Sequence, residues 1–525
     1  MNLKNINIMK KINTLLLAGL VLFSVSCEKQ LDINTNPNSA TSATPELILP
    51  QALTATAANL NGFNSYGAQL VGFSANAGGY GGFGTSISYN FTSSDFSGRW
   101  SSSYDNLQDY QYIIDNTAGK SKYKYYNAAA RIMKAIGFQL LVDAYNDVPY
   151  TEALKGASKL TPTYTKGDVI YKDLAAQLDT AIALINQGDT VSGITTFGSK
   201  DVLFGGDMDS WKKLANTIKL RLFVRAKDKV TFANTNFSAD GFLDADALIN
   251  PGYTRDNGRQ NPKWNSWGFS YTGSDANKAW IPSSYIMGFY NGSKLSDNGR
   301  GAAIYYKFPA TGINRLGVES SDLESCPSGS FWYPSTIRDG KNAGSTTGPL
   351  KGPEAGFPLI TAAESYFLQA EASMRGIITG NTKELFESGI YASFDYMYAL
   401  PDGSHELDPE VDATDYLANN ASSHLVNFDL ALTNETKLEA IITQKYIALN
   451  YVNSDEAWNE YRRTKYPKNT IGGSGVQTFT SIVSESTRAD KLPTRILYPS
   501  SEGSYNSANV PKGISPFTSL IFWAQ

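Results

Sequence analysis

The sequence is poor in the residues on which many enzymes and metal sites depend. Its 525 residues include only two cysteines and two histidines. Two cysteines exclude a disulfide-rich scaffold and a zinc site built from thiolates alone. Charged residues make up only 18% of the chain and leave a formal net charge of -4, with a pI near 5.5. This balance gives no broad positive field, which argues against a dedicated nucleic-acid binder.

The sequence also lacks a long apolar run. Leu15 to Val25 is apolar but spans only about 11 residues, whereas a helix needs about 20 to cross a bilayer. Basic residues precede this run at Lys4, Lys10 and Lys11. This order is typical of an export signal. The sequence leaves open whether translation starts at Met1 or at Met9, since Met9 would itself begin a compact signal.

A cysteine follows the apolar run directly. Phe23 to Cys27 resembles a bacterial lipobox, although Ser24 stands where leucine is usual. We therefore predict a signal peptide over residues 1–26, a lipid on Cys27 and a polar tether over residues 27–44. The alternative is ordinary signal cleavage with a disulfide between Cys27 and Cys326.

Helical periodicity appears in pairs of segments. Apolar residues recur at spacings of three and four in each member of four successive pairs. The pairs are 104–116 with 123–146, 168–186 with 209–227, 361–375 with 382–398, and 437–450 with 454–464. Helices with one apolar stripe that follow each other closely stack as antiparallel hairpins. We predict a mainly α, TPR-like α-superhelical scaffold of about four helix pairs, without a fixed 34-residue repeat.

Two stretches lack this periodicity. Residues 228–360 and 61–100 are rich in glycine and aromatic residues, and the first is too long for an ordinary loop. We predict one domain over residues 45–525, with a helical scaffold at 101–227 and 361–465 and an irregular insertion at 228–360. Irregular segments on a rigid scaffold are where binding usually occurs.

The residues give no clear catalytic constellation. His405 and His424 lie in one polar segment and form no evident nucleophile, base and orienter arrangement. Asp143 and Asp147 have the spacing of a carboxylate pair on one helix, which is common by chance. Residues 118–121, Ala-Gly-Lys-Ser, resemble the end of a phosphate-binding loop but lack its first glycine, and we interpret them as a turn. We predict no catalytic residue, no metal site and no cofactor.

Aromatic residues in the irregular stretches indicate a binding surface. Sugar rings pack a C–H face on an aromatic ring while their hydroxyls need polar partners. The insertion and a glycine-rich loop supply both kinds of group, and the predicted ligand-binding residues are Trp264, Trp267, Phe269, Trp280, Tyr80 and Phe83. The alternative is that these rings anchor irregular lobes to the core.

Several motifs occur in a specific order. They are 32–38 DINTNPN, 211–225 WKKLANTIKLRLFVR, 364–376 ESYFLQAEASMRG, 442–449 ITQKYIAL, 456–467 EAWNEYRRTKYP and 492–499 LPTRILYP. In combination with the lipobox they closely resemble the SusD/RagB-like nutrient-binding outer-membrane lipoproteins of Bacteroidetes. The resemblance covers nearly the whole mature chain.

The resemblance implies an outer-membrane, cell-surface location and association with a SusC-like TonB-dependent transporter. It also implies a protein without catalytic activity that captures oligosaccharide or peptide. The residues alone leave open a secreted hydrolase of extracellular polymers. Most charged and polar motif residues are expected to maintain the fold, because buried charges persist only when paired. These residues are Asn216, Arg221, Glu371, Lys445, Arg462 and Arg463.

Overall fold

The computed structural model describes residues 43–226 and 228–525. The predicted signal peptide, Cys27 and nearly all of the tether lie outside the described residues. The chain divides into two units, Met1–Thr44 and Pro45–Gln525, and the second holds the fold. No helix within the described ranges has both the length and the apolar character that crossing a bilayer requires.

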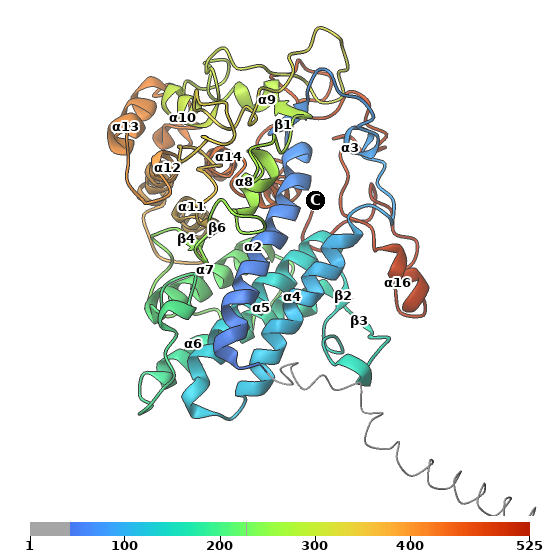
Figure 1. Cartoon of the computed structure of the whole chain (residues 1–525), viewed down its shortest axis with the longest axis vertical. Coiled ribbons are helices and arrows are strands. Elements are labelled where there is room, and N and C mark those ends of the chain that lie inside the picture. The colour runs from blue at the N-terminus through green and yellow to red at the C-terminus, as the bar shows by residue number, and fades with distance from the viewer. Residues whose placement is uncertain (1–42, 227) are drawn as a thin grey trace, which may run out of the picture. The chain divides into compact units, whose positions relative to one another are not determined.

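The second unit is mainly helical, as predicted (Figure 1). Its longer helices are α2 Pro45–Leu70, α4 Ser97–Thr117, α5 Lys124–Tyr145, α6 Gly167–Gly188, α7 Met208–Ala226, α11 Ala362–Met374, α12 Thr382–Tyr398, α13 Pro409–Asn419, α14 Asn434–Ala448 and α15 Ser454–Thr464. Its short helices are α3 Thr85–Ser88, α8 Pro262–Trp267, α9 Ser284–Met287, α10 Asn298–Ile304 and α16 Ser500–Tyr505. Its strands are β1 Ser74–Asn76, β2 Val148–Pro149, β3 Tyr164–Thr165, β4 Ala247–Ile249, β5 Trp280–Pro282 and β6 Phe357–Ile360.

The helices pack largely as the periodicity predicts. α4 packs on α5, α6 on both α5 and α7, and α11 on α12, while α7 and α14 both contact α11 and join the two parts of the scaffold. The fourth predicted pair differs, because α15 packs mainly against α2 rather than against α14. The TPR-like fold class is therefore confirmed, with one helix pair rearranged.

Helix α2 corrects the predicted boundary of the scaffold. It begins at Pro45, so the scaffold does not start at residue 101, and its last ten residues were assigned to an irregular stretch. The periodicity does not reveal α2, because its buried face includes small and polar residues such as Thr56, Asn64 and Gly67 in place of a continuous apolar stripe. A β-carbon at Gly67 would lie 2.3 Å from the Ser454 carbonyl oxygen, so only glycine permits this approach of α2 to α15.

Local caps explain where several helices begin. The Asn381 side chain accepts hydrogen bonds from the first N–H groups of α12, and Thr361 does the same for α11. Helix α13, which the periodicity also missed, begins with an Asp408 cap followed by Pro409 in the first turn. Asp-Pro at this position was the signal that could have revealed it.

The insertion is structured, as its length predicts. Its ends meet where β4 pairs with β6 in antiparallel register, with Ala247 opposite Ile360 and Ile249 opposite Phe357. Two more short antiparallel sheets occur in the described residues, β1 with β5 and β2 with β3. The rest of the insertion is loops and single turns of helix that surround buried aromatic side chains.

The centre of the scaffold contains a network of buried charges. Arg225 on α7 lies 2.5 Å from Asp143 on α5 and 2.5 Å from Glu456 on α15. Lys445 on α14 contacts the same Glu456 at 2.9 Å and Glu460 at 3.2 Å. Burial alone would lower the pKa of Arg225, but the neighbouring carboxylates raise it well above its usual value. The network therefore remains charged inside the core.

The network extends to α11. Arg463 donates two hydrogen bonds to the Glu371 carboxylate, each at 2.6 Å, and Glu371 also pairs with Arg375 at 3.0 Å. Arg221 pairs with Glu364 at 3.3 Å. The Trp523 ring nitrogen donates to Asp143 at 2.9 Å and joins the end of the described chain to α5.

The predicted structural role of the motif residues agrees with this geometry. Asn216, Arg221, Glu371, Lys445, Arg462 and Arg463 are all buried. Asn216 holds the loop after α7 through the carbonyl groups of Ser238 and Gly241. Arg462 donates to the carbonyl groups of Thr494 and Asp143.

Removing Arg225 should be costly. Arg225→Met leaves Asp143 and Glu456 without their main cation, so we expect the free energy of unfolding to fall by about 3–5 kcal/mol. Denaturant unfolding followed by circular dichroism measures the change. Lys213→Met is the matched control, because it breaks the exposed 2.8 Å pair with Asp244 and should cost about 0–1 kcal/mol. Equal losses in both variants would contradict a central role of the network.

A buried lysine makes stability depend on pH. Lys263 donates to the carbonyl groups of Tyr451 and Val452, and burial lowers its pKa to about 7. Between about pH 7 and 9 the unfolded chain binds this proton and the folded chain does not, so stability should rise with pH, by up to about 1.4 kcal/mol per unit.

Lys263→Met should remove this contribution to the slope. The measurement is urea unfolding at several pH values in this window, with Lys512→Met as an exposed control. Identical slopes in the wild type and Lys263→Met would show that the lysine remains charged in the folded state.

Candidate functional site

An exposed aromatic surface forms where two distant segments meet. Strand β1 pairs with β5 so that Asn76 lies opposite Trp280. The glycine-rich loop of residues 77–84 continues directly from β1, which places it beside Trp280. The loop is fixed at its start, since Ala77 N–H donates to the Ala279 carbonyl at 2.9 Å and Gly78 N–H donates to the Glu324 carbonyl at 3.1 Å.

Three of the predicted binding residues lie on this surface. Phe83 and Trp280 are half-buried and meet edge to face, with ring centroids 5.3 Å apart and an interplanar angle of 69°. Tyr80 is 44% exposed on the same loop. Phe83 on the glycine-rich loop therefore lies against Trp280 of the insertion. We call Tyr80, Phe83 and Trp280 the aromatic platform.

Polar groups adjoin the aromatic platform. Lys278 pairs with Asp275 at 2.9 Å, and Asp275 also accepts from the Ser328 hydroxyl at 2.6 Å and from Gly329 N–H at 2.9 Å. The hydrogen bond with Asp275 raises the pKa of Lys278, and Tyr80 contributes to the shift. The surface thus combines ring faces with fixed donors and acceptors, which suits a hydroxylated ligand with apolar faces.

The other three predicted binding residues belong to the core. Trp264 and Phe269 have 0% exposure and Trp267 has 2%, so none of them offers a face to a ligand in this structure. Trp267 packs edge to face on Tyr451, with centroids 4.8 Å apart, and Trp264 packs likewise on Tyr333 at 5.3 Å. Trp267 thus anchors the insertion to the scaffold, in agreement with the alternative interpretation, while Trp264 and Phe269 pack on Tyr333 within the insertion.

Trp267→Ala should therefore lower stability rather than affect ligand affinity alone. Loss of a buried indole leaves a cavity and should cost about 3–5 kcal/mol. Tyr80→Ala removes an exposed ring and should change the free energy of unfolding by about 0.5 kcal/mol or less. Thermal unfolding of both variants tests the assignment, and an unchanged melting temperature for Trp267→Ala would contradict it.

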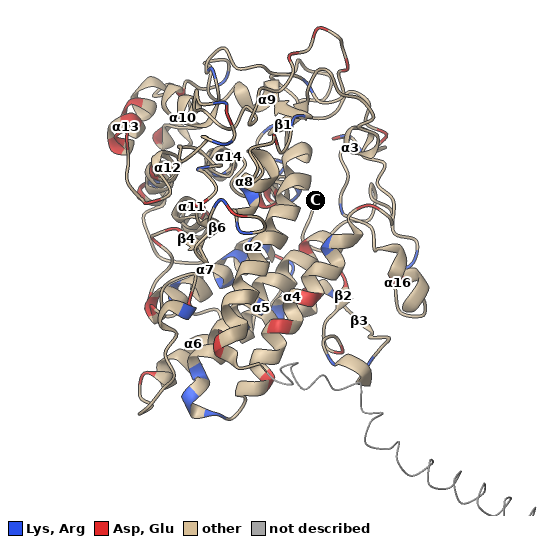
Figure 2. Cartoon of the chain, viewed as in Figure 1, with Lys and Arg blue, Asp and Glu red and all other residues tan. Residues whose placement is uncertain are grey.

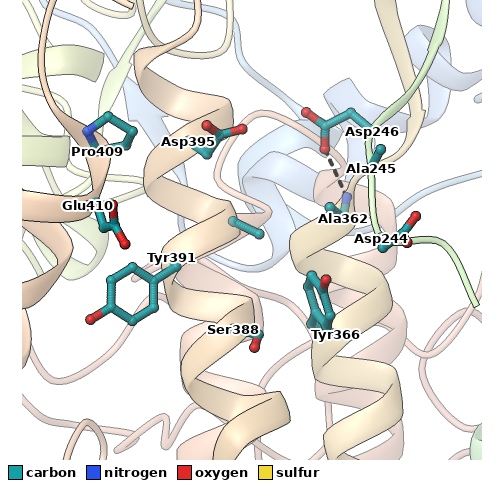
Figure 3. Close-up of a pocket in the computed structure, with 11 residues that line it drawn as sticks. Asp244, Ala245, Asp246, Ala362, Tyr366, Ser388, Tyr391, Asp395, Pro409 and Glu410 are labelled. Carbon is teal, nitrogen blue, oxygen red and sulfur yellow. Dashed lines mark hydrogen bonds between the residues drawn. The ribbon is translucent and has the colours of Figure 1, made fainter.

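A separate pocket of about 610 Å³ opens between α11, α12 and the start of α13 (Figure 3). Figure 3 shows Tyr366 on α11 and Tyr391 on α12, with Ser388 between them. The other polar groups that line it are the carboxylates of Asp244, Asp246, Asp395 and Glu410. No sequence pattern indicates this pocket, because its residues come from four separate segments.

Hydrogen bonds fix part of this pocket. Ala362 N–H donates to Asp246 at 2.8 Å (Figure 3), and His405 lies 3.1 Å from Asp395. Burial raises the pKa of Asp246 to about 6, and repulsion by Asp395 adds to the shift while the nearby Lys351 opposes it. The lining consists mainly of acceptors, so it can bind hydroxyl or cationic groups.

The residues that suggested a hydrolase are engaged elsewhere. Asp143 accepts hydrogen bonds from Tyr171 and Trp523 in addition to its pair with Arg225. Asp147 binds Lys166 at 2.7 Å and Gly167 N–H at 3.1 Å. Both carboxylates therefore serve the scaffold. Within the part of the chain that the structure describes, no group of three or more His, Cys, Asp or Glu side chains is placed to hold a metal ion.

Two family models match the chain. The model described as "Starch-binding associating with outer membrane" matches residues 37–249, and the one described as "Susd and RagB outer membrane lipoprotein" matches residues 350–519. Together they span most of the chain. None of the curated proteins matches it significantly.

Solved structures share the fold along nearly the whole chain. A SusD homologue from Bacteroides fragilis is 20% identical with a TM-score of 0.64, covering 92% of this chain and 99% of its own. A SusD/RagB family protein from Bacteroides thetaiotaomicron is 18% identical with a TM-score of 0.67, covering 92% and 99%. A chitin-binding SusD homologue from Flavobacterium johnsoniae is 22% identical with a TM-score of 0.63, covering 90% and 98%.

Proposed function

Because the chain belongs to the SusD/RagB family of outer-membrane lipoproteins, we propose that it captures oligosaccharides at the cell surface. In this proposal a lipid on Cys27 anchors it to the outer membrane, facing outward, and it delivers its ligand to a SusC-like TonB-dependent transporter. It acts by binding, without catalysis and without a cofactor.

The aromatic platform is the observation that carries this proposal. Exposed rings next to fixed polar groups match the two faces of a sugar, whereas a peptide would more often need charged or backbone partners. The chitin-binding homologue with the same fold supports a glycan over a peptide. Release to a transporter must follow capture, so we expect dissociation constants on the order of micromolar to millimolar.

A glycan array followed by calorimetry tests the platform. Tyr80→Ala should lower the affinity for the bound glycan by about tenfold, because stacking on one ring contributes about 1–1.5 kcal/mol. Tyr80→Phe should retain most of the affinity. Tyr505→Ala is the matched control, since Tyr505 is 81% exposed on α16.

Other outcomes would redirect or reject the proposal. If Tyr391→Ala lowers the affinity and Tyr80→Ala does not, the glycan binds in the pocket of Figure 3 and the platform assignment is wrong. Binding of peptides alone would replace the ligand class. Shortening of polysaccharide chains during incubation with the purified protein would favour the hydrolase instead.

A further inference from the structure

A second cavity, of about 320 Å³, lies at the turn between α4 and α5 and is closed on one side by α6. Lys120, Lys124 and Arg131 line it together with the hydroxyl-bearing residues Ser121 and Thr180. Figure 2 shows Lys and Arg gathered at this turn. The cavity belongs neither to the aromatic platform nor to the pocket of Figure 3.

The three cations that line this cavity have no carboxylate partner within the described residues. Lys124 donates to the neutral side chain of Gln187 at 2.5 Å, and Arg131 donates to Asn127 at 2.7 Å and to Gln177. Among residues 43–226 and 228–525, no side chain forms a hydrogen bond or an ion pair with the Lys120 ammonium group. By contrast, the buried cations of the central network are each paired with acidic groups.

The nearest carboxylates do not neutralise this charge. Asp173 attracts Arg131 but makes its hydrogen bonds with Tyr150 and Gln177, and Asp189 accepts from Tyr125 at 2.7 Å. One turn further along α5, burial lowers the pKa of Lys134 to about 8, and repulsion by Arg131 adds to the shift while Asp173 and Asp115 oppose it. Positive charge is therefore in excess on this face of α5.

The backbone geometry of this turn also favours an anion. Gly119 has a φ of 70° and turns the chain into a short 3₁₀ helix, Ser121–Tyr123, which leads into α5. Neither helix start has a side-chain cap, and the dipole of α5 favours negative charge near its first turn. Residues 118–121 are the segment whose sequence resembles the end of a phosphate-binding loop.

We infer that this cavity binds a phosphate group, either free or carried by a lipid headgroup. Three cations, the Ser121 hydroxyl and the positive end of the α5 dipole around one cavity match the charge and the acceptor oxygens of phosphate. The volume accommodates a phosphate ester as well as the free ion.

The position of the cavity favours a lipid headgroup. Helix α2 runs antiparallel to α4, with Thr56 bonded to Asn106 and Asn59 to Ser102, so its start at Pro45 lies toward the end of α4. The predicted tether therefore joins the fold at the same end as the cavity. This choice of source rests on the proposed lipid anchor, whereas phosphate binding itself does not.

The test uses the mature chain with Cys27→Ser, which removes any acyl chain. Calorimetry with inorganic phosphate at low ionic strength measures the site directly, and flotation with phosphatidylcholine vesicles, with and without phosphatidylglycerol, measures headgroup binding. The double variant Lys120→Gln and Lys124→Gln should lower phosphate affinity by about tenfold or more. Lys512→Gln, an exposed lysine outside the cavity, is the charge-matched control.

Each result has a defined meaning. Loss of both phosphate and phosphatidylglycerol binding in the double variant supports a headgroup site, and loss of phosphate binding alone supports a site for free phosphate. No binding in either arm, or equal losses in Lys512→Gln, overturns the inference. Glycan affinity should not change in the double variant, so failure here remains distinguishable from failure of the proposed glycan capture.

Discussion

The fold depends on a network of buried charged side chains. Each of them is stable inside the core only because oppositely charged side chains contact it. Arg225, Lys445 and Arg463 share the carboxylates of Asp143, Glu456 and Glu460, and Glu371 adds a bidentate contact. Removing such charges from water costs several kcal/mol per ion, and the pairs offset this only with accurate geometry. Five helices, α5, α7, α11, α14 and α15, must therefore take one relative position. We infer that the network contributes more to the choice of one helix arrangement than to the net free energy of unfolding.

The aromatic platform is attached to this rigid scaffold but is not part of the charged network. Tyr80, Phe83 and Trp280 lie on loops and on a short sheet, and none of them contacts the charged network. Their ring arrangement depends on the pairing of β1 with β5 and on the contact of Gly78 with Glu324. A loop attached at defined points to a fixed scaffold can hold exposed rings in a prepared geometry, which reduces the entropy lost on binding.

The sequence predicts the parts of the fold that have one apolar face. The bounds of α12 and α15 follow from periodicity and caps to the residue. The pairing of Arg221, Lys445 and Arg463 with acidic groups follows from the rule that buried charges persist only when paired. The periodicity fails for α2, because small and polar residues interrupt the apolar stripe on its buried face. The aromatic residues of the insertion were harder to assign, since composition cannot tell a ring that packs on Tyr451 from one that faces solvent. Trp280 differs from the buried Trp267 in that the pairing of β1 with β5 places it beside the glycine-rich loop, where it is only half-buried.

The members of the charged network are widely separated in the sequence, from Asp143 on α5 to Trp523 near the end of the described chain. A partly emerged chain would hold Asp143 and Arg225 without Glu456 or Glu460, and premature burial of these charges would be unfavourable. Completion of the charged network therefore requires segments from nearly the whole length of the described chain.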